Sequence, residues 1–392
     1  MRVNLDRIDQ PVETHHWLSA TQALDRLHVL PQTLYAYASR GRIRVQADPH
    51  DPRRSLYHRA DVERLARRRA GRHSAATIAA DAIDWGAPVL RSSLSAVVEG
   101  RLYYRGIDAV KWARNATLES TAQWLWETPV AHFGAMSSTP EAASPLARAM
   151  LALASDIPIG THAPLRAELI EQAQHLVTRL AHALLGPSRS TEYPLHLRMA
   201  EAWNAPQAAD LFRQALVLLT DHELNASTFA TRIAASTGAS MQAALLAGLS
   251  TLSGPAHGAA SLHAWAAIRR ARSQDLGQVA DMPIGTPGSF PAFGHPLYPQ
   301  GDPRASALLA QWQVPPHVAQ LQAALEQRSG EKPNIDFALA ALAESFALDA
   351  QAPMIIFTLA RSVGWIAHYL EQIESGALIR PRAAYSGPPI VT

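Results

Sequence analysis

Segments rich in alanine and leucine, with apolar residues recurring about every 3.6 positions, fill most of the chain beyond residue 105. This period places one apolar stripe along each helix, so the segments predict helices that pack against one another. Clusters of proline and glycine separate them, near 129–139, 254–258, 283–303 and 330–334. The clearest helical segments are 118–126, 165–185, 208–219, 241–252 and 354–373. The chain is therefore expected to have a mainly α body, with its loops at these breaks.

The region before the helical body has a different character. Residues 89–98, a turn at Glu99 and Gly100, and residues 102–104 predict a short β-hairpin. Residues 1–73 contain 14 arginines against 8 acidic residues, a net charge of +6, whereas the other residues carry a net −4. A small basic module joined through a linker at 70–83 to a mildly acidic body is the expected organisation. A basic module favours a polyanionic partner.

Residues 15–70 predict a specific order of elements. Ser19 suits the N-cap of a helix that runs to about Leu27, and Pro31 suits the first position of a second helix over 32–39. Residues 43–45 and 56–57 predict two strands around a turn-rich 48–52, and 59–69 predict a third helix.

This order resembles the winged helix-turn-helix of MerR-like and excisionase-like proteins. The resemblance implies that the second helix enters the major groove of DNA and that the strand pair, the wing, touches the backbone. The residues in these positions are Gln32, Thr33, Tyr35, Tyr37 and Arg40 on the helix, with Arg53 and Arg54 in the wing. The alternative is a module that has lost DNA binding and serves packing or oligomerisation.

Several classes of function are disfavoured. The chain has no cysteine, which excludes disulfides, thiolate metal sites and cysteine nucleophiles. It has no phosphate-binding GxxxxGK loop, no GxGxxG followed by an acidic ribose binder, and no GxSxG elbow. His222 and Glu223 would need a second histidine at 226 for a zinc protease, where alanine stands, so no metal is expected. No apolar stretch approaches a membrane span and the first residues lack a secretory signal, so we expect a cytoplasmic protein, although the absence of cysteine fits the periplasm almost as well.

Three short segments combine a proton-handling side chain with residues that bend or restrict the backbone. They are GPAHG at 254–258, FGH at 293–295 and PNIDF at 333–337. Two histidines and an aspartate in such settings form a minimum set for removing a proton beside one carbonyl while protonating another.

The order and local patterns of these segments resemble citrate synthase. The matching motifs are YRG at 104–106, DHELNAST at 221–228, GPAHG at 254–258, GHPLY and DPRA within 294–305, PNIDF at 333–337 and ARSVGWIAH at 360–368. The resemblance covers about residues 84–392. It implies an all-α fold with a large domain over 74–253 and 351–392, a small domain over 254–350, and a cleft between them, preceded by the winged helix-turn-helix over 1–73.

The resemblance also implies roles for individual residues. Asp336 would be the general base, His257 the donor to the thioester carbonyl and His295 the donor to the keto carbonyl. The keto-acid pocket would comprise His222, Asn225, Arg304, Arg361 and Phe357, with Arg380 reaching in from the partner of a homodimer. Lys332 would meet a coenzyme A phosphate.

The implied reaction joins acetyl-CoA to oxaloacetate, giving citrate in the tricarboxylic acid cycle, with the acyl-CoA as cosubstrate and no permanently bound cofactor. The chain departs from the family at AASL (259–262) and PLYP (296–299), so propionyl-CoA and 2-methylcitrate stay open. A synthase for a different 2-keto acid is a further alternative. Another class of function is a regulator whose body senses a keto acid or an acyl-CoA and controls a DNA-binding module.

Competing structural readings exist for several of these residues. Asp336 could cap a helix over 337–346, and His222, expected early on a helix, could have a capping or core role. Lys332 could be an ordinary solvated lysine, and Arg382 competes with Arg380 for one role.

Overall fold

The computed structural model describes residues 16–48, 51, 53–70, 90–134, 140–155, 157–158, 164–187, 192–274, 276, 279, 290, 292–383 and 385–388. The chain divides into two compact units, Met1–Leu90 and Arg91–Thr392. Apart from residue 70, the linker predicted at 70–83 lies outside the described residues. The division of the body into a large and a small domain stays a prediction.

The N-terminal unit contains three strands and three helices. In chain order they are β1 (Trp17–Ser19), α1 (Ala20–Leu27), α2 (Pro31–Ser39), β2 (Val45–Ala47), β3 (Ser55–His58) and α3 (Arg59–Ala70). The strands form an antiparallel sheet in the order β1-β3-β2. The predicted helices and the pairing of two strands are confirmed, although the first strand lies at 45–47 and not at 43–45, and the edge strand β1 was not predicted.

Local capping and one buried ion cluster explain this arrangement. Ser19 and Gln22 form a reciprocal capping box at the start of α1, which confirms Ser19 as the N-cap. The buried carboxylate of Asp61 on α3 accepts from Arg44 Nε at 2.8 Å and from Arg64 Nη2 at 2.6 Å. Asp61 thereby connects α3 to the chain just before β2, around a small apolar core that includes Leu34 and Val62.

The second unit begins with the predicted hairpin. Strands β4 (Ser95–Val98), β5 (Arg101–Tyr104) and β6 (Ile107–Asp108) pair antiparallel in that order. Glu99 and Gly100 form the two-residue turn, with φ of 51° and 73°. Two positive φ values in succession match the twist of the flanking strands, which is why a tight hairpin forms here.

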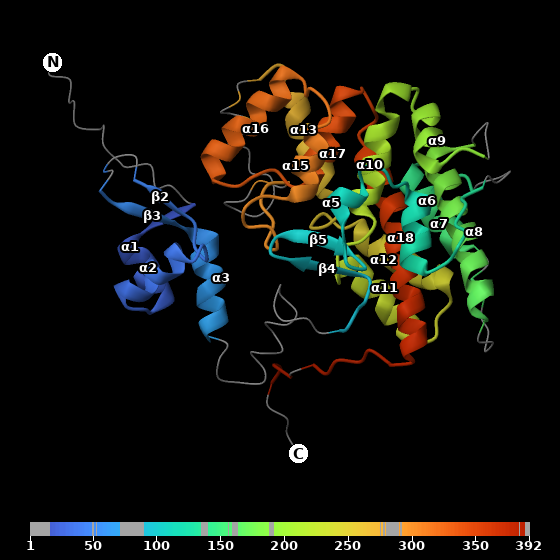
Figure 1. The fold of residues 1–392 in the computed structure, drawn as a ribbon, viewed down its shortest axis with the longest axis horizontal. Coiled ribbons are helices and arrows are strands. Elements are labelled where there is room, and N and C mark those ends of the chain that lie inside the picture. Colours follow the sequence, from blue (N-terminus) through green and yellow to red (C-terminus); the bar gives the residue numbers. More distant parts are fainter. Residues whose placement is uncertain are drawn as a thin grey trace. The chain divides into compact units, whose positions relative to one another are not determined.

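Helices make up most of the remaining described residues of this unit (Figure 1). They are α5 (Ala109–Trp112), α6 (Leu118–Trp126), α7 (Pro145–Ala154), α8 (Arg166–Leu185), α9 (Leu195–Ala202), the short 3₁₀ turn Pro206–Ala208, α10 (Ala209–Leu219), α11 (Ala226–Ser236), α12 (Met241–Leu252), α13 (Ala260–Arg270), α15 (Pro303–Leu309), α16 (Pro316–Ser329), α17 (Ile335–Ser345) and α18 (Ala352–Ser375). The body is therefore mainly helical, as expected.

The long helix α18 occupies the centre of the main core. It packs against α6, α8, α10, α11 and α12, and almost every residue from Ala352 to Leu370 is buried (Figure 1). A second core lies among α13, α16 and α17, where Phe293 and Phe337 meet with ring centroids 5.1 Å apart.

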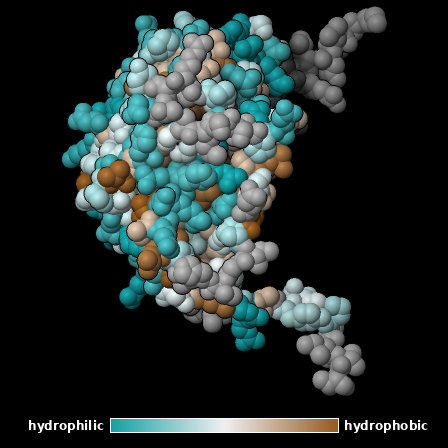
Figure 2. All heavy atoms as spheres, turned by 90° about the vertical axis from the view of Figure 1, so that its right-hand side faces the viewer, coloured by the Kyte–Doolittle hydropathy of each residue, from teal (hydrophilic) through white to brown (hydrophobic). Residues whose placement is uncertain are grey.

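The surface of the body is mixed in character. Figure 2 shows a face on which hydrophilic residues predominate and hydrophobic residues are scattered. Within the described ranges, no helix is long and apolar enough to cross a membrane.

Candidate active site

The segment that carries His222 is a non-helical link between α10 and α11, with a turn at Glu223. The expectation that His222 sits early on a helix is wrong, because α11 begins only at Ala226, with Asn225 as its N-cap. Hydrogen bonds to strand β4 of the hairpin keep this link from forming a helix. Ser95 Oγ accepts from the backbone N–H of Glu223 at 2.9 Å, and the Glu223 carboxylate accepts from Val97 N–H at 2.6 Å. Glu223 itself has a φ of 51°, a left-handed conformation that the two contacts maintain.

His222 meets residues of the GHPLY motif. Its Nε2 lies 2.8 Å from the hydroxyl of Tyr298, and its ring centroid lies 5.0 Å from that of His295. The ring of Tyr298 also packs on His295, with centroids 4.9 Å apart. Two of the predicted histidines are therefore neighbours, joined by a buried tyrosine.

Arg304 is positioned by the acidic residue just before its helix. Asp302 is the N-cap of α15, and its two oxygens accept from Arg304 Nε at 3.0 Å and Nη2 at 2.8 Å. Asp302 Oδ2 also accepts from the backbone N–H of Ile335 at 3.1 Å, which brings α15 next to α17. The Arg304 guanidinium lies 5.3 Å from the centroid of the Tyr298 ring.

Asp336 lies in the first turn of α17, and the competing cap role for it is wrong. Asn334 is the N-cap, because its Oδ1 accepts from Asp336 N–H at 3.0 Å. The Asn334 amide also donates to Gly294 O at 3.1 Å, which connects α17 to the loop of His295. Within the described part of the chain, Asp336 Oδ1 is buried and has no hydrogen-bond partner.

His257 lies in the turn after α12. Its Nε2 is 2.9 Å from Ser227 Oγ on α11, and its ring centroid is 5.9 Å from that of Phe357. Gly258 is required beside it, because a Cβ at that position would lie 2.8 Å from the carbonyl oxygen of Leu252. The glycine thus lets the chain turn tightly against the end of α12.

Phe357 and Arg361 occupy one face of α18, one turn apart. The Arg361 guanidinium lies 4.8 Å from the Phe357 ring centroid, and its Nε donates to Leu219 O at 2.9 Å. Arg361 is only 1% exposed. A buried arginine with a single backbone acceptor within the described residues has donors available for an anion.

Burial and the two arginines set the charge states of the histidines. Burial lowers the pKa of His257 to about 4, and Arg361 acts in the same direction. Burial, together with Arg304, lowers the pKa of His295 to about 4 and outweighs Asp302, which acts the other way. Burial and Arg304 likewise hold the pKa of His222 well below its ordinary value. All three imidazoles are therefore neutral at pH 7.

The pKa of Asp336 shifts in the opposite direction to the pKa values of the three histidines. Burial raises its pKa to about 7 even though Arg304 and Arg361 lower it in part. Burial also lowers the pKa of Arg361 to about 10, which Asp221 partly opposes. The structure thus brings Asp336, Arg304, Arg361 and the three histidines into one electrostatically coupled cluster.

Other predicted residues lie outside this cluster or are already engaged. Arg380 is exposed in the segment that follows α18. Lys332 is 60% exposed and pairs with Glu326. Asn225 uses its side-chain oxygen to cap α11 and to accept from Ser227 Oγ. The sequence interpretation missed Ser227, Tyr298 and Asp302 as contact residues, although all three stand inside motifs that it identified.

The predicted DNA-contacting residues lie in two places in the N-terminal unit. Gln32, Thr33 and Tyr35 are on α2, where Tyr35 is 58% exposed, and Arg40 is exposed at its C-cap. Arg53 and Arg54 are exposed between β2 and β3, where Arg54 pairs with Asp51 at 3.2 Å.

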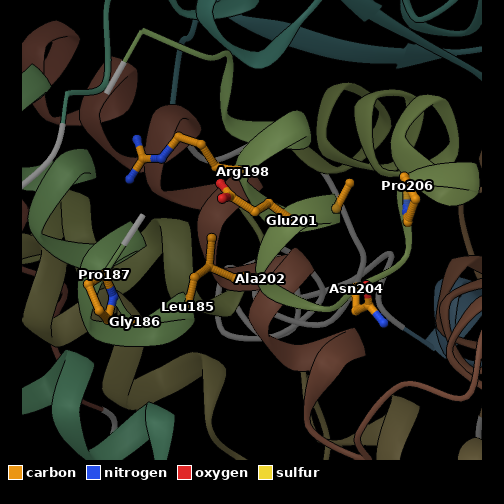
Figure 3. A pocket seen from close by; sticks show the side chains of 9 residues that line it. Leu185, Gly186, Pro187, Arg198, Glu201, Ala202, Asn204 and Pro206 are labelled. Atoms are coloured by element: carbon orange, nitrogen blue, oxygen red, sulfur yellow. The ribbon is translucent and has the colours of Figure 1, made fainter. Parts of the chain in front are cut away.

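An open cavity lies away from the cluster. It has a volume of about 440 Å³ and is lined by residues of α8, α9 and the chain just after them, among them Leu185, Arg198, Glu201 and Asn204 (Figure 3). No candidate site residue borders it. The chemistry of the cluster, not this cavity, therefore identifies the candidate site.

Comparison with known proteins assigns the body. Residues 83–382 match the family model described as "Citrate synthase, C-terminal domain". "Citrate synthase" of Mycolicibacterium smegmatis is 27% identical over 78% of this chain and 94% of its own. "Citrate synthase 2" of Bacillus subtilis is 30% identical over 47% of this chain, and "2-methylcitrate synthase 1" of Corynebacterium glutamicum is 34% identical over 45%. The chain spans about half the length of several of these relatives, 52% for the Bacillus subtilis protein.

Solved structures share the fold. The citrate synthase of Thermotoga maritima superimposes with a TM-score of 0.64 at 24% identity, over 78% of this chain and 96% of that one. The citrate synthase of Thermoplasma acidophilum, solved as a ternary complex with carboxymethyl coenzyme A and oxaloacetate, gives 0.63 at 21% identity, over 78% and 95%. With a family model that covers most of its length, the chain belongs to the citrate synthase family.

Proposed function

We propose that the body condenses an acyl-CoA with oxaloacetate, in the manner of a citrate synthase. In this reaction acetyl-CoA, oxaloacetate and water give citrate and free coenzyme A. The observation that carries the proposal is the cluster itself, in which a carboxyl with a pKa of about 7 shares a buried site with neutral histidines.

Asp336 is the general base of the proposed reaction. The methyl group of an acyl thioester is a weak acid, so its proton must pass to a base held against it. Asp336 has a buried oxygen with no partner among the described groups, and its raised pKa makes it a stronger base than an exposed aspartate. The enolate formed by this step then attacks the keto carbon, and water finally cleaves the thioester.

His257 and His295 stabilise the two oxygens on which charge develops. A neutral imidazole donates one hydrogen bond without carrying a charge, and His257 would direct it to the thioester oxygen, His295 to the keto oxygen. For His257 to donate through Nδ1, its Nε2 must accept. The Ser227 hydroxyl, 2.9 Å away, supplies that proton in our proposal, for which it must turn from Asn225 Oδ1, to which it donates in the structure.

The cationic groups fit a dicarboxylate. Arg361 and Arg304 provide two guanidinium groups, His222 lies within the electrostatic influence of both, and Phe357 packs against Arg361. We further propose a homodimer in which Arg380 of a second copy completes the pocket. No permanently bound cofactor is required, and Lys332 is assigned to a coenzyme A phosphate, for which it would have to leave Glu326.

The test measures release of free coenzyme A with a thiol reagent. The protein contributes no thiol background, since it has no cysteine. Oxaloacetate is supplied with acetyl-CoA or with propionyl-CoA, and Asp336→Asn is the matched control. We expect turnover that falls at least a hundredfold in the variant, and the faster acyl-CoA decides between citrate and 2-methylcitrate. Oxaloacetate binding without turnover would instead support the sensor role.

We propose DNA binding through α2 and the wing as a second function. The supporting observation is that, within the described residues of the N-terminal unit, some arginines form ion pairs and others do not. Arg26 and Arg44 are engaged by Glu63 and Asp61, whereas Arg40 and Arg53 are exposed and have no ion pair within the described residues. Exposed cations beside an exposed α2 suit contacts with DNA phosphates.

The test uses the full chain and a random DNA duplex at low salt. The double variant Arg40→Ala/Arg53→Ala should bind more weakly and show a smaller dependence on salt. Arg26→Ala is the matched control, because Glu63 already occupies that arginine, and it should bind like the wild type. Binding that is undiminished in the double variant would contradict this proposal.

A further inference from the structure

A line of buried polar groups begins at Asp221, beside the keto-acid cluster. Asp221 is fully buried, and its Oδ2 accepts from Ser95 Oγ at 2.5 Å and lies 3.1 Å from His368 Nε2. Its Oδ1 has no hydrogen-bond partner among the described residues. None of these groups has a role in the reaction proposed above, so their burial requires another account.

His368 continues the line toward the surface. The ring is fully buried, and its Nδ1 lies 3.4 Å from Arg232 Nη1. Arg232 in turn pairs with Glu371 at 2.6 Å, and Glu371 accepts from Ser93 N–H at 2.6 Å. Because arginine has only donors, Nδ1 of His368 must accept, which leaves the Nε2 proton to face Asp221. The charges along this line alternate in sign, from the negative Asp221 through the positive Arg232 to the negative Glu371.

The same line lies against the helix that carries Arg361. His368 follows Arg361 by seven residues on α18, so both lie on one face of the helix. At Gly364, between them, a Cβ would lie 2.1 Å from Thr220 O and 2.9 Å from Asp221 Oδ1. The helix backbone therefore meets the Asp221 segment without space between them.

The positive charges of the two arginines in the cluster are compensated by different groups. Arg304 has its own carboxylate in Asp302, with two parallel hydrogen bonds. Arg361 has one hydrogen bond to a backbone oxygen, and the charge that chiefly supports its protonated form is that of Asp221. Asp221 also directly precedes His222, so a shift of Asp221 would move two groups of the proposed pocket.

We propose that Asp221 and His368 are positioning residues for keto-acid binding. Asp221 holds Arg361 and the His222 segment in place, and His368, supported by Arg232 and Glu371, holds Asp221. This inference rests on the proposed function and extends it to residues that touch no substrate.

The experiment replaces His368 in the full-length protein. His368→Leu keeps most of the volume but removes the donor to Asp221, whereas His368→Gln can restore an N–H near the position of Nε2. We expect KM for oxaloacetate to rise roughly tenfold in the leucine variant, with kcat and the KM for the acyl-CoA within about threefold of wild type. The glutamine variant should recover most of the loss. Calorimetric titration with oxaloacetate provides the same comparison without turnover.

The outcomes of this experiment distinguish failure of the positioning role from failure of the proposed function. Unchanged oxaloacetate affinity in folded His368→Leu, a loss confined to kcat, or a glutamine variant no better than leucine would overturn the positioning role. If the leucine variant does not fold, Ser95→Ala removes the other donor to Asp221 and should raise the same KM, and an unchanged KM there would overturn the role. A wild-type protein that binds no oxaloacetate would overturn the proposed function itself.

Discussion

At the scale of single residues, burial is the largest cause of the pKa shifts that suit the cluster to acid–base work. The same loss of solvent that disfavours imidazolium also disfavours carboxylate, so His257 and His295 become neutral while the pKa of Asp336 rises. The opposite shifts create a base and two uncharged donors from ordinary side chains. A charged imidazole would stabilise the bound substrate already before the reaction. A neutral imidazole donor stabilises chiefly the transition state, in which negative charge develops on the substrate oxygen.

The hydroxyl of Ser227 should matter for the rate, although it would not touch the substrate. Ser227→Ala removes the partner of His257 Nε2, so the ring tautomer is no longer fixed. We expect kcat to fall roughly tenfold, the equivalent of one hydrogen bond of about 1.4 kcal/mol. Ser236→Ala is the matched control on the same helix, because Ser236 bonds only to Ile233 O among the described groups. Equal kcat values in the two variants would contradict the role of Ser227.

The pH profile of turnover should report Asp336. A protonated carboxyl cannot accept the methyl proton, so with a pKa of about 7 kcat should fall as the pH is lowered through 7. Below that value the decrease should be about tenfold per pH unit. His257 and His295, with pKa values of about 4, stay neutral from pH 6 to 9 and add no second limb there. Measurement of kcat at saturating substrates checks this, and a profile that is flat down to pH 5 would exclude Asp336 as the base.

At the scale of elements, the site depends on how closely α18 approaches the link after α10. Gly364 provides the clearest measure, since any side chain there would overlap Thr220 O. Gly364→Ala should therefore push the helix and the link apart, lowering the free energy of unfolding by about 2 kcal/mol and raising KM for oxaloacetate. Denaturant unfolding and steady-state kinetics measure the two effects.

Gly134→Ala is a suitable control for that substitution. Among the described residues, a Cβ at Gly134 would meet nothing within 4 Å, so the variant should unfold and turn over like the wild type. If Gly364→Ala also behaved like the wild type, the close contact between α18 and the Asp221 segment would not be needed for binding.

Local patterns were sufficient for the helices but not for the link between α10 and α11. The predicted segments 118–126 and 241–252 coincide with α6 and α12, because each has an unbroken apolar stripe and a polar cap. His222 was expected early on a helix, yet the link is non-helical and Asp221 within it is bonded to Ser95, 126 positions earlier in the chain. Contacts over such a separation leave no trace in the periodicity of a local window, and the pairing of Asp221 with His368 escaped prediction for the same reason.

At the scale of the whole molecule, the charges of one chain leave the proposed pocket short of positive charge. Arg304 is neutralised by Asp302, and Arg361 is partly compensated by Asp221. A dicarboxylate brings two further negative charges, so another cation is needed for it to bind well. Arg380 is exposed in its own chain, with no ion pair among the described residues, and is therefore available to a second copy.

A mixing experiment tests this shared pocket directly. Asp336→Asn supplies a chain without the base, and Arg380→Ala supplies a chain without the shared arginine, so neither homodimer should turn over well at low oxaloacetate. In a random equal mixture half of the dimers are hybrids, and each hybrid has one site in which both residues are intact. We expect about a quarter of the wild-type activity to return on mixing. Arg382→Ala, the matched control, should keep wild-type affinity by itself. Activity that does not rise on mixing would mean that Arg380 serves its own chain or no site at all.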